Sequence, residues 1–124
     1  MKPKRLKEGD DRHIKGFILN KLYLGGYLCK RGKKHHGKHT SIRNLPKGYA
    51  LKHRGKFSKI ISELKRDGFI MIFPSVGEKH TCAVLDPEKI GSGLMIVNAF
   101  REAVELLPLD KRFREITKNK KEMG

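Results

Sequence analysis

The stretch between residues 29 and 39 contains the residue types that could hold a metal ion. Four candidate ligands, Cys29, His35, His36 and His39, lie within eleven positions, and thiolate and imidazole are preferred zinc ligands. Structural zinc sites usually present paired ligands held by tight turns, whereas here a lone cysteine precedes a cationic loop that would repel a dication. The pattern therefore favours a phosphate-binding loop over a zinc site, and we expect no cofactor.

The acidic residues do not form a catalytic pattern. Asp10, Asp11, Glu63 and Asp67 are scattered among basic residues, whereas metal-dependent nuclease chemistry needs clustered carboxylates. No glycine-rich phosphate loop precedes a Lys-Ser or Lys-Thr pair. We therefore expect a protein that binds its partner without catalysis and takes no small-molecule substrate.

The charge balance points to a polyanionic partner. The 124 residues carry a formal net charge of +16. Each phosphate neutralised by Lys or Arg releases a condensed counterion, which makes nucleic-acid binding favourable and salt-dependent. A basic surface could also serve solubility or attachment to anionic lipid, and these alternatives stay open.

Hydropathy and cysteine usage indicate a soluble, cytoplasmic protein. No apolar run approaches the roughly 18 residues of a membrane span, and the N-terminal residues 1–5 lead into no signal-like apolar core. Cys29 and Cys82 are too few for a secreted disulfide framework, so we expect them to be reduced and semi-buried.

Apolar periodicity predicts a first helix with Asp11 as its N-cap and the pair Gly25-Gly26 as its end. Its apolar face would consist of Ile14, Phe17, Ile18 and Leu22. Residues 1–10 are basic and aperiodic and predict a mobile arm.

Residues 30–39 form the most basic stretch and predict a loop. Thr40 or Ser41 would then cap a brief helix through Leu45 that Pro46 ends. Residues 52–56 form a second cationic stretch that opens the next helix.

The third helix has the clearest periodicity and would end before Gly68. Its apolar face is Phe57, Ile60, Ile61 and Leu64. Its other face carries Lys56, Lys59, Ser62, Glu63 and Arg66. Two β-rich runs, 69–74 and 80–85, flank a turn-like segment and predict a hairpin.

The remaining residues predict further helix. Asp86 is a cap with Pro87 in the first helical position, and residues 91–93 (Gly-Ser-Gly) predict a flexible joint. A helix would follow that Pro108 ends, with an apolar face of Val97, Phe100, Val104 and Leu107. A short helix containing Phe113 and Ile116 would precede a basic tail.

This order of elements predicts an α+β fold of the winged helix-turn-helix kind, with three helices, a β-hairpin wing and additional C-terminal helix. We assign residues 1–10 to a basic arm, 11–90 to the winged-helix domain, and 91–124 to a C-terminal helical extension and basic tail.

The run 38–48 (KHTSIRNLPKG), followed by the helix and hairpin of residues 57–85, resembles small winged-helix proteins of archaea. The resemblance covers roughly residues 13–90. It implies nucleic-acid binding, although winged helices serve as transcription regulators, ribosomal proteins and docking modules.

The candidate nucleic-acid contacts are the basic side chains of the loop, the brief helix, the third helix and the wing. They are Lys30, Arg31, Lys33, Lys34, His35, His36, Lys38, His39, Arg43, Lys47, Lys52, Arg54, Lys56, Lys59, Arg66 and Lys79. Cations at both ends of the third helix suit phosphate contacts that position it.

Two classes of nucleic-acid partner are compatible with this sequence. Cations in the arm, loop, third helix and tail suggest embedding in structured RNA, as in an archaeal ribosome with ribosomal proteins as neighbours. The alternative is a winged-helix transcription regulator or chromatin protein on duplex DNA. We favour RNA.

Overall fold

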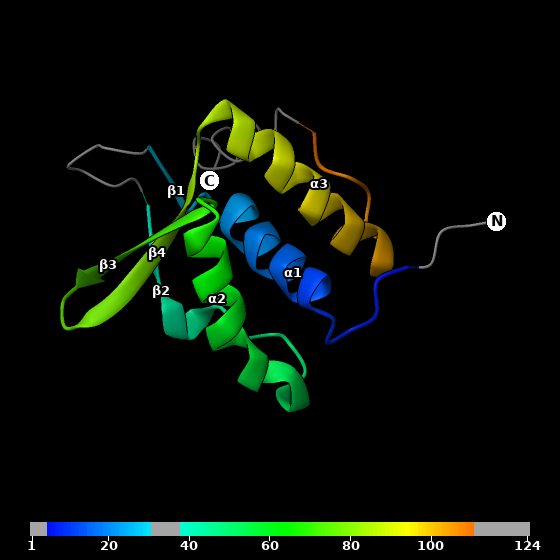
Figure 1. Ribbon diagram of the computed structural model, residues 1–124, viewed down its shortest axis with the longest axis horizontal. Coiled ribbons are helices and arrows are strands. Elements are labelled where there is room, and N and C mark those ends of the chain that lie inside the picture. The colour runs from blue at the N-terminus through cyan, green and yellow to red at the C-terminus, as the bar shows by residue number, and fades with distance from the viewer. Residues whose placement is uncertain (1–4, 31–37, 111–124) are drawn as a thin grey trace, which may run out of the picture.

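The computed structural model describes residues 5–30 and 38–110, which form a mixed α+β fold of three α-helices and a four-stranded sheet (Figure 1). The elements in chain order are α1 (Asp11–Leu24), β1 (Leu28–Cys29), β2 (Thr40–Ser41), the 3-10 helices η1 (Ile42–Asn44) and η2 (Leu51–Lys56), α2 (Phe57–Arg66), β3 (Ile70–Ser75), β4 (Glu78–Val84) and α3 (Pro87–Ala103). The predicted α+β class is confirmed.

Helix α1 lies where the periodicity predicts it, with its N-cap one residue earlier than expected, at Asp10. The helix ends at Gly25, and Gly26 has a φ of 73°, a conformation that glycine adopts without steric cost. The helix contacts both α2 and α3 (Figure 1). It is therefore the central helix of the core.

The brief helix after residue 40 is confirmed as the 3-10 helix η1. The side chain of Ser41 accepts a hydrogen bond from the backbone N–H of Arg43, as an N-cap does. Residues 52–56 do not open α2 directly, because they belong to the separate 3-10 helix η2 that precedes it.

Helix α2 ends in a glycine-based cap. The N–H of Phe69 donates to the carbonyl of Leu64, the N–H of Gly68 donates to that of Lys65, and Gly68 has a φ of 83°. This pair of bonds is the Schellman motif. It sends the chain directly from α2 into β3, as the sequence predicts.

The predicted hairpin is confirmed, with a tighter turn than expected. Strands β3 and β4 pair in antiparallel fashion around the two-residue turn Val76-Gly77, where both residues have positive φ. Such turns match the natural twist of the strands. Strand β4 therefore begins at Glu78, two residues before the predicted start.

Strand β4 pairs with each of the other three strands of the sheet. Strand β3 lies along one edge, while β1, in parallel, and β2, in antiparallel orientation, pair with it as well. The β2 pairing lies in the middle of β4 and the β1 pairing at its C-terminal end, since Thr40 pairs with Thr81 and Leu28 with Ala83.

The two cysteines are not reduced, and that expectation is wrong. A disulfide joins Cys29 of β1 to Cys82 of β4 across 53 positions of sequence. Both residues are buried, and the parallel pairing of β1 with β4 brings their Cα atoms to 5.7 Å. The sulfur of Cys29 is thus already bonded and is not free to serve as a zinc ligand.

One core joins the three helices to the sheet. Its completely buried members include Ile14, Ile18, Leu19, Leu22, Leu45, Ile60, Leu64, Ala83 and Val97. All four positions of the predicted apolar face of α2 are buried. The helical periodicity therefore identified the core side of α2 correctly.

The flexible joint predicted at residues 91–93 is wrong, because these residues lie inside α3. Gly93 is buried, and a Cβ atom there would overlap the hydroxyl oxygen of Tyr23 on α1. The position between residues 90 and 91, where we divided the chain, thus falls within a continuous helix.

Helix α3 begins with Pro87 after Asp86, as predicted, and ends at Ala103, before the expected stop at Pro108. Of its predicted apolar face, Val97 and Phe100 are buried, whereas Val104 and Leu107 lie beyond the helix and are exposed. The predicted helix at Phe113 and Ile116 lies outside the described residues.

Among the residues that the structure describes, no helix combines the length and apolar composition needed to cross a bilayer.

The end of the predicted arm is fixed to the body of the protein. The N–H of Gly9 donates to the hydroxyl of Tyr49 at 2.7 Å, and the carbonyl of Gly9 accepts from Lys56 Nζ at 2.8 Å. The same Tyr49 hydroxyl lies 2.7 Å from His13 Nδ1. Because the hydroxyl accepts from Gly9, its own proton is free to be donated to a neutral His13 imidazole.

We expect this contact to make stability depend on pH. Burial, opposed by Glu8 and Asp10, lowers the pKa of His13 below its ordinary 6.5. A lowered pKa favours the neutral ring in the folded protein, so its contribution is complete above 6.5 and is lost as pH falls below it.

The test compares urea unfolding of wild type and His13→Gln, whose amide oxygen can still accept from Tyr49, between about pH 7.5 and pH 5. We expect wild type to lose more stability than the variant over this interval. Equal losses would show that His13 does not contribute to the pH dependence.

Candidate nucleic-acid interface

A groove of about 450 Å³ lies between η1, η2, α2 and the hairpin. Four basic side chains from four different elements line it: Arg43 of η1, Arg54 of η2, Lys65 of α2 and Lys79 of β4. Two hydroxyl groups, those of Ser58 and Ser62 on α2, line it as well. The described lining includes no carboxylate, so the groove concentrates positive charge in a concave surface.

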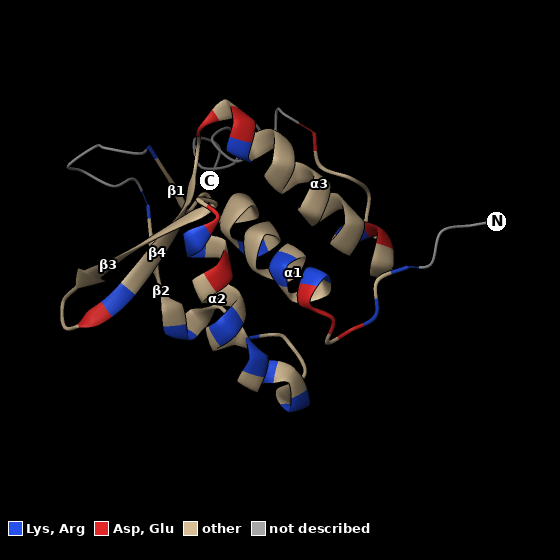
Figure 2. Ribbon diagram, viewed as in Figure 1, with Lys and Arg blue, Asp and Glu red and all other residues tan. Residues whose placement is uncertain are grey.

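Figure 2 shows basic residues on η1, η2, α2 and the β4 arm of the hairpin, with an acidic residue beside the hairpin turn. Glu78, the first residue of β4, pairs with Arg43. The Arg43 side chain is 82% exposed, and exposed ion pairs contribute only about 0–1 kcal/mol. Arg43 can therefore exchange this partner for a phosphate at little cost.

The walls of the groove are held in place by backbone contacts. Arg54 Nε donates to the carbonyl oxygen of Tyr49 at 3.1 Å. Lys21 Nζ of α1 donates to the carbonyls of Asn44 at 2.9 Å and Leu45 at 3.1 Å, and also to that of Lys47. Burial, together with the nearby Lys47 and Arg54, lowers the pKa of Lys21. The Lys21 ammonium group is therefore used to hold the turn after η1 in place, and we do not count it among the ligand contacts.

Three predicted contacts, Lys56 at the end of η2 and Lys59 and Arg66 on α2, do not line this groove. Lys59 Nζ lies 3.5 Å from Asp11 of α1, and Lys56 Nζ bonds to Gly9. Arg66 bonds to the adjacent Asp67 at 3.0 Å, and this hydrogen bond lowers the pKa of the exposed Asp67 carboxyl. Glu63 likewise pairs with Lys15 of α1 at 3.4 Å.

The reason lies in the helical repeat. Lys56, Lys59 and Glu63 follow one flank of the buried face, toward α1, whereas Ser58, Ser62 and Lys65 follow the other flank, toward the hairpin. Ser58 and Lys65 were not among the predicted contacts. Their spacing at i, i+4 and i+7 with Ser62 could have indicated them, but only the position of the hairpin shows which flank is open.

The other predicted contacts do not lie in the groove. Lys30, Lys47 and Lys52 are exposed, Lys38 Nζ lies 4.9 Å from the centre of the Tyr27 ring, and His39 Nδ1 lies 2.9 Å from His80 Nδ1. The predicted contacts Arg31, Lys33, Lys34, His35 and His36 lie outside the described residues.

The metal hypothesis gains no support from the described part of the chain. Of its four ligands, Cys29 is bonded to Cys82, His39 faces His80, and His35 and His36 are not described. Within residues 5–30 and 38–110, no three His, Cys, Asp or Glu side chains come together as metal ligands.

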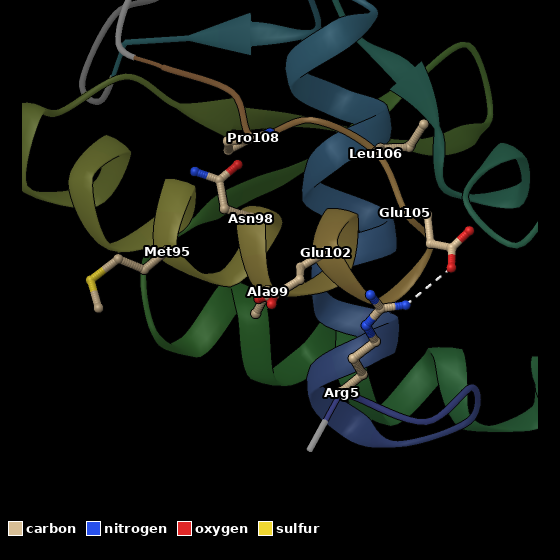
Figure 3. Close-up of a pocket in the computed structure, with 8 residues that line it drawn as sticks. All are labelled: Arg5, Met95, Asn98, Ala99, Glu102, Glu105, Leu106 and Pro108. Carbon is tan, nitrogen blue, oxygen red and sulfur yellow. Dashed lines mark hydrogen bonds and ion pairs between the residues drawn. The ribbon is translucent and has the colours of Figure 1, made fainter. Parts of the chain in front are cut away.

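A larger pocket of about 660 Å³ lies on α3 and the segment that follows it (Figure 3). Its one lysine or arginine side chain among the described residues, Arg5, pairs with Glu105 at 3.1 Å, and Glu102 lies nearby. Met95, Ala99, Leu106, Pro108 and the polar Asn98 line the rest. Among the described residues that line this pocket, the carboxylates of Glu102 and Glu105 outnumber the single cation, so it suits a polyanion less well than the groove does, and size alone does not identify the site.

Comparison with family models, with curated proteins and with solved structures found no match to this chain.

Proposed function

We propose that this chain is a non-catalytic nucleic-acid-binding protein of the winged helix-turn-helix kind, in which the groove between α2 and the hairpin holds the phosphate backbone. The observation that carries the proposal is the convergence of Arg43, Arg54, Lys65 and Lys79 on one groove. These residues come from four elements, so their proximity is a property of the fold rather than of a basic stretch of sequence.

The order of elements supports the winged-helix assignment. Helix α1 is followed by β1, β2, the short helices η1 and η2, α2 and the β3–β4 hairpin, and β2 pairs with β4 beside the hairpin. In winged helices the third helix and the wing flank the nucleic acid. Here α2 and the hairpin both line the basic groove, together with η1 and η2.

Structured RNA is the partner we favour. Basic residues outside the groove, including Lys30, Lys47 and Lys52, are exposed. A structured RNA can contact a protein on several sides through shape and phosphate contacts. A linear duplex offers these outlying cations fewer phosphates.

The test compares two variants that lose the same charge. The groove variant changes Arg43, Arg54, Lys65 and Lys79 to glutamine. The flank variant changes Lys56, Lys59 and Arg66 to glutamine, together with Arg12, an exposed residue of α1. Fluorescence anisotropy would measure binding of an RNA hairpin and of a DNA duplex of equal length across a salt series. Thermal unfolding of both variants serves as the control for folding.

We expect the groove variant to weaken RNA binding and to reduce the slope of log K against log salt by about 3–4, near one per lost phosphate contact. The flank variant should keep most of the wild-type slope. A wild-type slope in the groove variant would contradict the proposal. If wild type bound the DNA duplex more tightly than the RNA hairpin, the result would identify duplex DNA as the partner instead of RNA.

A further inference from the structure

The floor of the groove has a different chemistry from its rim. Ile42, Pro46 and Ile72 are partly exposed there, and Ile61 and Phe57 lie beneath them in the core. Phosphate contacts do not require an apolar floor, since the cations of the rim supply them. The floor therefore suits a second, apolar group of the ligand.

A nucleobase is an apolar group that nucleic acid can place between its phosphates. The groove volume, about 450 Å³, lies within the range of sites that enclose small ligands. Bases in a continuous duplex are stacked and paired, so they cannot reach a concave floor. Unpaired bases in loops and bulges can be turned outward, and RNA-binding proteins commonly read them.

The polar groups around the floor also fit a base. Ser62 Oγ donates its proton to the carbonyl of Ser58 at 3.1 Å, so its lone pairs are left to accept from a donor such as an exocyclic amine. The bond from Arg54 Nε to Tyr49 fixes the Arg54 guanidinium at the groove wall. A guanidinium plane is a surface on which bases stack.

We infer that the groove takes one unpaired nucleotide of RNA, with its base on Ile42, Pro46 and Ile72 and its flanking phosphates at Arg43, Lys65 and Lys79. This inference rests on the proposed nucleic-acid function and specifies which part of the RNA enters the groove. On this inference the free energy of binding has two contributions. The one from the cations of the rim depends on salt, and the one from the apolar floor does not.

The experiment uses two RNA hairpins that differ only by a single bulged 2-aminopurine, whose fluorescence reports unstacking. Binding of each would be measured with wild type, with Ile72→Asn in the groove floor, and with Met95→Asn. Met95 is 77% exposed on α3 and provides a substitution of the same kind far from the groove. Thermal unfolding of each variant verifies its fold, and Ile42→Asn gives a second floor variant should Ile72→Asn unfold.

We expect wild type to bind the bulged hairpin about tenfold more tightly than the paired one at the same salt, which corresponds to about 1.4 kcal/mol. The 2-aminopurine fluorescence should change on binding. Ile72→Asn should remove the preference while leaving the salt slope unchanged, and Met95→Asn should keep both.

Equal binding of the two hairpins, with the groove cations still required, would refute this inference and leave the proposed function intact. A preference that survives Ile72→Asn and Ile42→Asn would also refute it, because the floor would then not contact the base. Absence of RNA binding by wild type would instead contradict the proposed RNA-binding function itself.

Discussion

Replacing Leu64 by alanine is expected to lower the free energy of unfolding by about 2–5 kcal/mol, the usual cost of truncating a buried leucine. Leu64 lies on α2 and is 0% exposed within the cluster that joins α1, α2 and the sheet. The substitution removes apolar contacts and leaves a cavity. The backbone carbonyl of Leu64, which accepts the cap bond from Phe69, is retained.

Urea unfolding followed by circular dichroism measures this loss. Lys59→Ala on the exposed side of the same helix is the control, with an expected change within about 0.5 kcal/mol. A Leu64→Ala protein of undiminished stability that fails to bind RNA would mean that this side chain belongs to an interface rather than to the core.

Replacing Gly16 by alanine is expected to cost about 1–3 kcal/mol or more through overpacking. Gly16 of α1 is buried against α3, and a Cβ atom there would clash with Cβ of Phe100 and lie 2.9 Å from the backbone oxygen of Ile96. Backbone atoms cannot move aside as the end of a side chain can. The two helices would have to separate, which loosens the packing along their whole contact.

Gly91→Ala on α3 is the matched control for this substitution. Among the described residues, no atom outside the neighbouring residues and the local backbone of α3 lies within 4 Å of a Cβ at Gly91, so alanine there should raise stability by about 0.5–1 kcal/mol through its higher helix propensity. The two variants add the same methyl group, and we expect opposite changes in the free energy of unfolding. Equal effects in urea unfolding would show that the close approach of α1 to α3 does not determine the cost.

Local patterns were sufficient to predict several elements of the fold. The spacing of Phe57, Ile60, Ile61 and Leu64 identified α2 and its buried face, because a helix turns by a constant angle per residue. The end of α2 at Gly68 and the hairpin that follows were predicted for a similar reason, since positive φ is a property of single residues and short turns.

The candidate site was predicted only in part. Arg43, Arg54 and Lys79 were among the predicted contacts and line the groove, whereas Lys59 and Arg66 of α2 do not. Periodicity separates the buried side of a helix from its exposed side. It cannot tell which exposed flank faces a partner and which faces α1, because that depends on elements distant in sequence.

By itself, the sequence determined that this chain is strongly basic, that its helices and hairpin follow in the order now seen, and which residues form most of the core. Charge and apolar spacing are properties of neighbouring residues, so they can be read without coordinates. The tertiary structure alone decided that Cys29 meets Cys82, that Gly93 packs against Tyr23, and that apolar and basic side chains of several elements line one groove. Each of these contacts joins residues of different elements, and their approach is set by how the helices and the sheet pack together.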